Sequence, residues 1–317
     1  MQTQTGLPVS SNAAARPDFS QKLQRLWRDM KKNKAMYGLM APYMILFTLF
    51  TVLPVATSIF LSFTYYNIIE PPRFIGWENY KLLLLDDDVF LIAVKNTLMF
   101  AFITGPLSYF GALLLAWFIN ELKPKVRAVA TLLFYAPSIS ANVFFIWTYI
   151  FQADSYGFVN SSLMRLGIIK EPVAWLQKPE YNLYIIMLVA LWMSLGTGFL
   201  AFIAGFQNID KTLYEAGAID GIKNRWQELY LITLPSMAPQ LVFAAVLQIA
   251  ASFAVSDVAA QLAGFPSPLY SAHTIVLHMV DYGNIRYEMG YASAIAVVLF
   301  SITVAFGQFA RRVIKAD

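Results

Sequence analysis

Long apolar stretches separated by short polar connections dominate the chain. Six of them reach or approach the length of about 20 residues that an α-helix needs to cross a bilayer. None alternates between apolar and polar positions as a strand would, so the pattern predicts an all-α, polytopic membrane protein with six transmembrane helices. These stretches are Tyr37–Tyr65, Thr97–Ile119, Ala128–Phe151, Leu183–Phe206, Ala238–Val255 and Met289–Ala310.

Composition narrows the class of protein further. Apolar residues make up 58% of the 317 positions and charged residues only 13%, about half of the roughly 25% typical of soluble chains. An ordinary soluble enzyme is therefore disfavoured, and so is disorder over most of the length. The chain has no cysteine and two histidines, which excludes thiolate chemistry and leaves little room for a histidine-built metal centre.

The distribution of positive charge predicts the orientation. If both ends lie in the cytoplasm, 16 of the 23 lysines and arginines fall on inner segments, as the positive-inside rule requires. We therefore expect a multi-pass, N-in and C-in arrangement. Residues 1–35 would form an inner tail, with either a basic amphipathic helix or a solvated connection at Gln21–Lys34. Residues 36–312 would form the transmembrane domain, and 313–317 a second inner tail.

The inner connection Gln207–Met237 carries folding signals of its own. Either Asn208 or Asp210 can cap a helix over Lys211–Ile219, and Asp220-Gly221 supplies a turn. A second short helix is predicted over Arg225–Ile232, which Pro235 separates from the fifth span. This helix–turn–helix would stand outside the membrane with apolar side chains uncovered. Either a partner protein covers them or the element packs on the chain's own span ends; the side chains are Leu213, Tyr214, Ala216 and Ile219.

At this connection the sequence resembles a known family. The run Glu215–Gly221 (EAGAIDG) followed by Ile232–Pro235 (ITLP) resembles the EAA signature of permease subunits of binding-protein-dependent ABC importers. Gly217 departs from the usual second alanine. Ten residues separate Gly221 from Ile232, one more than the common spacing. Further motifs resemble the carbohydrate-uptake branch (maltose, glycerol-phosphate and oligosaccharide permeases): Phe74–Tyr80 (FIGWENY), Asp154–Asn160 (DSYGFVN), Ala204–Gln207 (AGFQ) and Gly290–Ala294 (GYASA).

The resemblance implies a role and a set of partners. The chain would be one permease of a pair in the bacterial plasma (inner) membrane, beside a second homologous permease. Two cytoplasmic ATPase subunits would bind ATP and Mg, and an extracytoplasmic sugar-binding protein would deliver the substrate. Residues 207–235 would form the cytoplasmic coupling loop that docks on an ATPase. The docking residues implied by the motif are Glu215, Ala216, Gly217, Asp220 and Gly221.

Chemistry of the chain's own is not indicated. The sequence contains no G-x-x-x-x-G-K-[ST], HExxH or GxSxG motif, so we expect no catalytic, cofactor-binding or metal-binding residue, and no nucleic-acid partner. His273 and His278 are spaced poorly for one metal, and Asp86–Asp88 is interpreted as a solvated outer turn rather than a calcium site. The spans are nearly free of charge, which disfavours the alternative of a gradient-driven carrier or channel. A non-transporting membrane scaffold is a third possibility.

The spans offer aromatic and neutral polar groups to a substrate. Sugar rings stack on aromatic faces, while amides and hydroxyls bind their hydroxyl groups. The same residue types also serve interface belts and helix packing. No arginine lies within a span, which favours a neutral saccharide, held by this permease or by its partner. The candidates for the substrate pathway are Asn142, Trp147, Trp192, Ser194, Gln248, Ser252 and Asp257.

Overall fold

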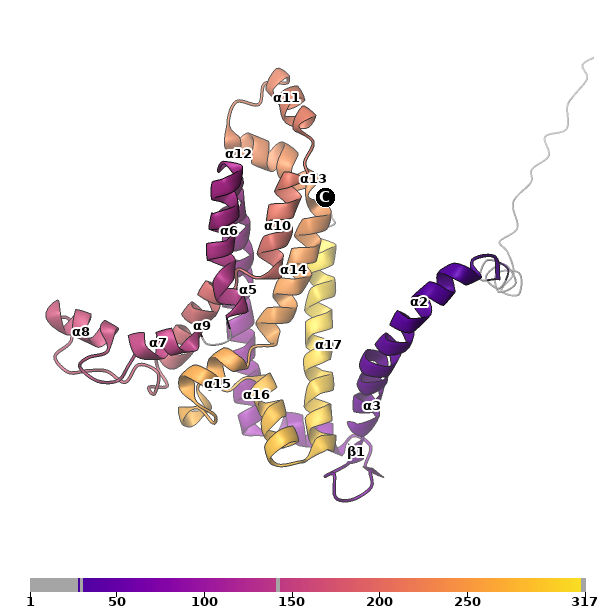
Figure 1. The fold of residues 1–317 in the computed structure, drawn as a ribbon. Helices are drawn as coiled ribbons and strands as arrows, with labels where there is room; N and C mark the ends of the chain where they lie inside the picture. The colour runs from indigo at the N-terminus through magenta and orange to yellow at the C-terminus, as the bar shows by residue number, and fades with distance from the viewer. Residues whose placement is uncertain (1–27, 29–30, 141–142, 315–317) are drawn as a thin grey trace, which may run out of the picture. The chain divides into compact units, whose positions relative to one another are not determined.

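The computed structural model describes residue 28 and residues 31–140 and 143–314. Helices make up nearly all of its regular structure, which confirms the all-α prediction (Figure 1). Most of the amphipathic segment predicted at 21–34, Asn142 and residues 315–317 lie outside the described part. In chain order the α-helices are α2 (Lys34–Phe47), α3 (Leu53–Leu61), α4 (Glu78–Lys81), α5 (Asp88–Asn120), α6 (Pro124–Ile139), α7 (Phe144–Ile150), α8 (Phe158–Arg165), α9 (Asn182–Met193), α10 (Thr197–Gln207), α11 (Lys211–Ile219), α12 (Arg225–Glu228), α13 (Leu234–Ser236), α14 (Ala238–Phe253), α15 (Asp257–Ala263), α16 (Ile275–Val280) and α17 (Met289–Ile314).

Five continuous or nearly continuous helical runs among the described residues are long and apolar enough to cross a membrane. A sixth candidate is the pair α6 and α7, which is bent by 83°. The predicted third span is therefore a broken element, in agreement with a chain of six membrane segments. The five runs are Lys34–Leu61, Asp88–Asn120, Asn182–Gln207, Ala238–Ala263 and Met289–Val313.

Residues 1–57 and 58–317 form two separate units. The described part of the first unit is helical, with a π-helical turn at Thr48–Val52, and none of its helices buries a residue. Leu39, for example, is 85% exposed. A side chain so apolar and so uncovered requires lipid or protein around it, because water solvates it poorly.

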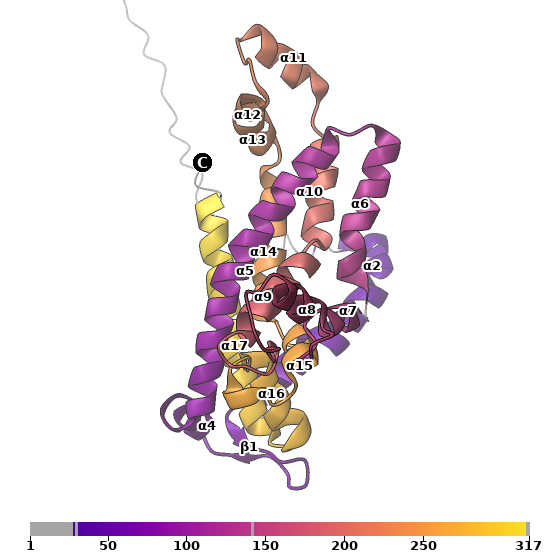
Figure 2. The ribbon, with the colours of Figure 1, turned by 90° about the vertical axis from the view of Figure 1, so that its left-hand side faces the viewer.

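The second unit is a bundle built around α5. This helix packs against α10 and α14, and α14 packs in turn against α17 (Figure 2). Alanines on α5, including Ala112 and Ala116, share a buried cluster with Phe199 and Phe202 of α10. Small side chains on one helix admit large rings from its neighbour, which is how helices approach closely where water contributes little driving force.

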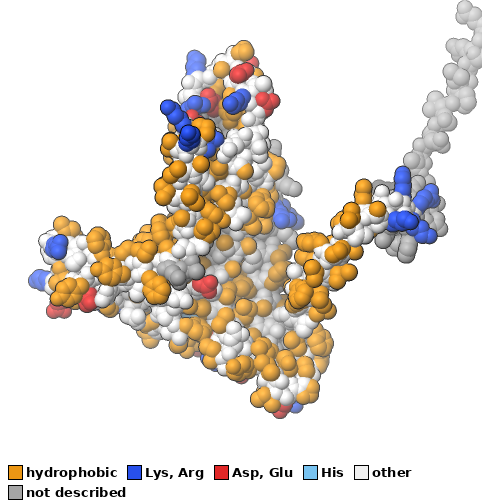
Figure 3. All heavy atoms as spheres, in the orientation of Figure 1, with side chains coloured by type: hydrophobic (Ala, Val, Ile, Leu, Met, Phe, Trp, Pro, Cys, Tyr) orange, Lys and Arg blue, Asp and Glu red, His pale blue; other side chains and the backbone are white. Residues whose placement is uncertain are grey.

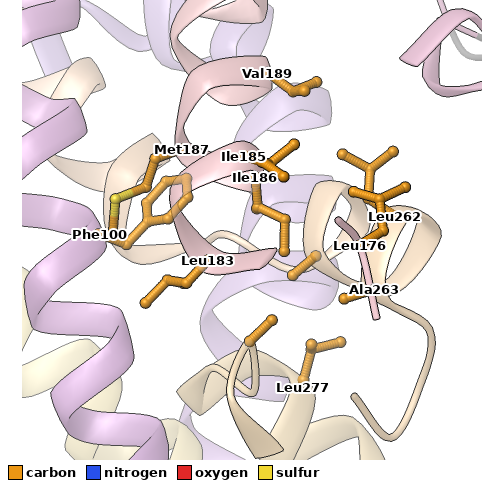
Figure 4. Packing of buried hydrophobic residues seen from close by; sticks show 12 residues of the cluster. Phe100, Leu176, Leu183, Ile185, Ile186, Met187, Val189, Leu262, Ala263 and Leu277 are labelled. Carbon is orange, nitrogen blue, oxygen red and sulfur yellow. The ribbon is translucent and has the colours of Figure 1, made fainter. Parts of the chain in front are cut away.

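A second buried cluster ties the ends of several helices together (Figure 4). Ile186 and Val189 of α9 are fully buried. They belong to one cluster with Phe100 of α5, Leu262 of α15 and Leu277 of α16. Segments far apart in the sequence thereby hold one another in place, which fixes the walls of the cavity described below.

A short hairpin after the first span is held by two of the family-like motifs. Its strands β1 (Thr64–Tyr65) and β2 (Arg73–Phe74) pair antiparallel, with Thr64 opposite Phe74. The side-chain amide of Asn79 donates to the carbonyls of Ser62 and Thr64, both at 2.9 Å. Gly290 leaves no room for a side chain against the carbonyl of Thr64. The FIGWENY and GYASA motifs therefore have a structural role, since they fasten the hairpin to the start of α17.

The interpretation of Asp86–Asp88 as solvated fits Asp86 and Asp88, which are exposed, but is wrong for Asp87. Its side chain is 9% exposed and accepts hydrogen bonds from the N–H of Phe90 at 2.8 Å and from the hydroxyl of Tyr291 at 2.7 Å. Asp87 is thus the N-cap of α5, which begins at Asp88 rather than at Thr97. The apolar pattern places the start at Thr97 because Lys95 and Asn96 separate the apolar residues 89–94 from the rest of the helix.

Both histidines join Asp87 in a buried chain. His278 Nε2 lies 2.9 Å from Asp87 Oδ2, and His273 Nε2 lies 3.2 Å from His278 Nδ1. An ionised Asp87 requires a proton on His278 Nε2, so His278 Nδ1 accepts and His273 Nε2 donates. His273 Nδ1 is then an acceptor, buried and without a partner among the described residues. Those residues contain no group of three or more side chains suited to a metal.

Candidate functional site

The helix predicted over Lys211–Ile219 forms with those bounds as α11. Of the two capping candidates, Asp210 takes the role, because its Oδ1 accepts from the N–H of Thr212 at 3.0 Å. This bond to the ionised form holds the pKa of Asp210 below its usual value. A carboxylate at this position also interacts favourably with the positive end of the helix dipole.

The turn after α11 is the one that the sequence predicts. Gly221 has φ +94°, a value that residues with a Cβ rarely adopt. The N–H of Ile222 donates to the carbonyl of Gly217 at 2.9 Å, and that of Gly221 to Ala218 at 3.4 Å. This pair of bonds is a Schellman cap, which ends the helix with its last carbonyls satisfied.

The second helix of the loop differs from the prediction. It is α-helical only over Arg225–Glu228, continues as a π-helical turn over Leu229–Thr233, and then passes through Pro235 in α13. Pro235 does not end it, since proline is tolerated in the first turn of a new helical segment. The break falls at Met237 (φ −98°, ψ 8°) instead.

The π-helical turn explains the longer motif spacing. Such a turn closes i→i+5 bonds and so holds one residue more than an α-turn. The extra residue between Gly221 and Ile232 is absorbed there without turning the helix away from α11. The hydroxyls of Tyr214 and Thr233 still meet at 2.9 Å, and Ile232 still faces Gly217.

One face of α11 is exposed and the other is packed. Gly217 is buried and Tyr214 half-buried, whereas Glu215, Ala216 and Asp220 are exposed. Leu213 and Ile219 on the exposed side are 45% and 87% exposed. No described residue covers this face. Uncovered apolar groups beside carboxylates at the polar end of a protein are typical of a docking surface.

The loop is fastened to the end of α5. Arg225 forms ion pairs with Glu228 at 2.7 Å and with Glu121, which follows α5, at 3.2 Å. The rings of Trp117 and Trp226 pack with centroids 4.8 Å apart. Exposed ion pairs contribute little stability, but the tryptophan contact adds apolar area. These contacts join α12 to the end of α5.

A cavity of about 410 Å³ lies among the spans, at the break between α9 and α10. Ser194 and Gly196 lie in that break, where the backbone is not helical. Irregular backbone at membrane depth is tolerated where it lines a cavity. Neighbouring helices contribute further hydroxyl and amide groups to the wall: Thr104 and Ser108 from α5, Ser138 from α6, and Gln248 and Ser252 from α14.

The polar groups of the cavity suit an uncharged polyol. Ser194 and Ser252 donate to carbonyls of their own helices at 2.6 and 2.9 Å, so their oxygens can accept from a ligand. Ser108 Oγ is buried without a partner among the described residues. None of the residues that line the cavity carries a charge.

The predicted pathway residues are distributed unevenly. Ser194, Gln248 and Ser252 line the cavity. Trp147 and Trp192 pack edge to face with centroids 5.4 Å apart and lie outside the lining. Asp257 is exposed at the start of α15, and Asn142 lies outside the described residues. Sequence reasoning missed Thr104, Ser108, Ser138 and Thr197; the run SLGTG at 194–198, which interrupts an apolar stretch, was an available signal.

Comparisons with known proteins agree with this arrangement. A family model described as "Binding-protein-dependent transport system inner membrane component" matches residues 108–315. The chain is 34% identical to the probable ABC transporter permease protein YesP of Bacillus subtilis, over 86% of this chain and 87% of that protein. It is 31% identical to the arabinooligosaccharides transport system permease protein AraP of the same organism, over 87% and 88%. The sulfoquinovosyl glycerol transport system permease protein SmoG of Agrobacterium fabrum is 29% identical, over 91% and 93%.

The fold is also similar to that of a solved transporter. A chain in the crystal structure of a bacterial alginate ABC transporter, in complex with an alginate pentasaccharide-bound periplasmic protein, superposes with a TM-score of 0.74 at 25% identity. The match covers 92% of this chain and 99% of that chain. The protein is therefore an integral membrane permease subunit and belongs to the family of binding-protein-dependent transport system inner membrane components of ABC transporters.

Proposed function

We propose that this chain forms half of the translocation pathway of an ATP-driven importer of a neutral sugar or oligosaccharide. The observation that carries the proposal is a continuous connection from an exposed docking face to a cavity. Glu215 and Ile219 are exposed on α11, and the loop that holds them is fastened through Arg225 to the end of α5. Helix α5 in turn lines the uncharged cavity through Thr104 and Ser108.

In this role the chain couples ATP hydrolysis to transport and does not hydrolyse ATP itself. It lacks a phosphate-binding loop, so partner ATPase subunits would bind ATP and Mg and receive the exposed face of α11. Closure of those subunits would move residues 207–235 as one body. Because α12 is joined to α5, the motion would tilt the spans and change the side from which the cavity is open.

The remaining partners follow from the same role. A second, homologous permease would complete the pathway, and an extracytoplasmic binding protein would deliver the sugar. The ends of the chain would lie in the cytoplasm, as the excess of lysine and arginine on the inner segments favours. The relative named for arabinooligosaccharides transport supports a saccharide as substrate. The uncharged cavity wall favours a neutral saccharide over an acidic one.

Reconstitution tests this function directly. The complete complex in proteoliposomes should take up a labelled neutral oligosaccharide only with ATP and with the sugar-loaded binding protein present. The chain alone should transport nothing under a proton or sodium gradient. Gradient-driven uptake by the chain alone would instead establish a secondary carrier and overturn the proposal.

A further inference from the structure

A second pocket, of about 520 Å³, lies between the start of α6 and the coupling loop. It is separate in its lining from the cavity described above. Trp117, Phe206 and Tyr214 form its aromatic walls, and three cations line it: Arg127, Lys211 and Arg225. Figure 3 shows lysine and arginine side chains gathered at this end of the bundle.

The charges in this pocket are not balanced. Arg225 is held by both carboxylates of the lining, Glu121 at 3.2 Å and Glu228 at 2.7 Å. Arg127 and Lys211 form no ion pair with any described residue. One positive charge is therefore left in excess, and a ligand with a single negative charge would neutralise it.

Two polar atoms of the pocket lining are buried without a hydrogen-bond partner. They are Oδ1 of Asn120 and Nε of Arg127. Nη2 of the same arginine donates to the carbonyl of Leu122 at 3.2 Å. An unpaired donor and an unpaired acceptor are costly to bury. A ligand that carries both an anionic oxygen and a hydroxyl group would satisfy the two together.

The position of the pocket indicates where such a ligand comes from. It lies where α5 ends at Asn120 and α10 ends at Gln207, the depth at which apolar spans give way to polar headgroups. Helix α6 extends away from the pocket, and none of its residues is buried. Its apolar side chains Val129 and Leu132 are 59% and 63% exposed, and an acyl chain can lie along them.

We propose that this pocket binds the headgroup of an anionic phospholipid, of which phosphatidylglycerol is the best match. Arg127 and Lys211 bind the phosphodiester, and a glycerol hydroxyl donates to Asn120 Oδ1. The lipid then joins the start of α6 to the start of α11 and braces the coupling loop against the membrane surface. This site goes beyond transport, and its occupancy does not depend on the substrate.

Lipid binding by the purified permease complex tests the site. After delipidation, phosphatidylglycerol is titrated in detergent against excess phosphatidylcholine and bound lipid is counted by native mass spectrometry. The double variant Arg127→Gln/Lys211→Gln should bind about 30-fold more weakly, if each cation contributes about 1 kcal/mol. Lys211→Gln alone, an exposed position that leaves the fold intact, should bind about fivefold more weakly.

A matched pair of control substitutions at the start of the same helix distinguishes a specific binding site from general attraction to a charged surface. Lys123→Gln/Lys125→Gln removes two positive charges nearby that do not line the pocket, and it should bind as the wild type does. Equal loss in this control pair would overturn the proposal, as would wild-type binding by the Arg127 and Lys211 variants. Competition by inorganic phosphate or glycerol phosphate at matched concentration would assign the pocket to a soluble anion and overturn the proposal that it binds a lipid.

Discussion

Ile232 occupies the space that a side chain at position 217 would need. A Cβ placed on Gly217 would lie 2.6 Å from Ile232 Cδ1 and 3.0 Å from Ile222 Cδ1. The two helices of the coupling loop therefore touch backbone to side chain. This contact joins α11 to the second helical segment of the loop, as the proposed motion of the loop as one body requires.

The effect of a substitution at Gly217 on uptake should depend on the size of the new side chain. Both nearest atoms are ends of flexible isoleucine side chains, and alanine is favoured over glycine in a helix by about 1 kcal/mol. Gly217→Ala should therefore keep uptake within about twofold of wild type. Gly217→Leu should lower it about tenfold, since overpacking costs about 1–3 kcal/mol.

Ile232, the other residue in this contact, provides the control for the prediction. Gly217→Leu combined with Ile232→Ala should recover much of the lost uptake, whereas Ile232→Ala alone should have a small effect. Uptake by Gly217→Leu at the wild-type level, with normal membrane insertion, would show that the close contact is unimportant.

Charge reversal on the exposed face of α11 should uncouple transport. Glu215 is exposed, so Glu215→Lys should change stability by less than about 0.5 kcal/mol while it removes the acidic group offered to an ATPase. Uptake and co-purification of the ATPase should both fall about tenfold or more, a loss of about 1.4 kcal/mol or more in docking. Glu180→Lys, an exposed charge reversal in the connection between α8 and α9, is the matched control and should behave as wild type.

Gly221→Asp tests the same docking element through the backbone. At φ +94° a residue with a Cβ is strained by about 1–2 kcal/mol, so the Schellman cap should open and α11 should tilt. We expect the inserted protein to retain its thermal melting behaviour in the spans but to lose ATP-dependent uptake. Normal uptake by this variant would mean that the orientation of α11 does not matter.

The cavity should bind substrate through the side-chain amide of Gln248. Gln248→Leu removes a donor and an acceptor from the wall, each worth about 1 kcal/mol to a bound sugar. The concentration of loaded binding protein that gives half-maximal uptake should rise, or the maximal rate fall, by about 30-fold. Gln240→Leu on the same helix but outside the cavity lining should leave uptake nearly unchanged; equal losses in both variants would point to a packing defect in α14.

Acid should destabilise the end of the bundle that contains His273. Burial, and to a lesser extent the neighbouring His278, lowers the pKa of His273 from 6.5 to about 4. The unfolded chain therefore binds more protons between these values, so this contribution is complete above pH 6.5 and falls as pH drops toward 4. The charges of Asp87, Asp281 and Arg286 also influence the pKa of His273. Burial raises the pKa of Asp87, but its interactions with Phe90, Tyr291 and His278 outweigh this and lower it overall. Asp87 therefore titrates below this pH window.

The melting temperature of the purified protein between pH 4 and 8 measures this effect. Wild type should lose up to about 3 kcal/mol across the window. His273→Gln keeps an N–H donor toward His278 but cannot titrate, so its melting temperature should change less over the same range. Part of the dependence should remain, because burial also lowers the pKa of His278. Parallel curves for the two proteins would contradict the assignment to His273.

The features that the sequence predicted well are local. A run of apolar residues long enough to cross a bilayer needs no distant contact to be recognised, and Gly221 takes its left-handed turn for reasons contained in its own backbone. The helix over Lys211–Ile219 formed with the predicted bounds because its cap, Asp210, is the adjacent residue.

The features that it missed depend on distant partners. Asp87 is buried because His278, 191 residues away, lies against it, and nothing near Asp86–Asp88 announces that contact. The end of the second loop helix at Met237 rather than Pro235 depends on a π-helical turn that one extra residue creates. The cavity draws its wall from six helices, so only the residues that interrupt an apolar run could be selected in advance.

Thiol labelling of the cavity tests the central claim most directly, because the chain contains no native cysteine. Ser252→Cys in the reconstituted complex should react with an impermeant reagent from one side of the membrane without nucleotide and from the other side with ATP trapped on the ATPases. In a Glu215→Lys background the reactive side should no longer change with ATP. Unaltered switching in that background would show that the exposed face of α11 does not drive the spans.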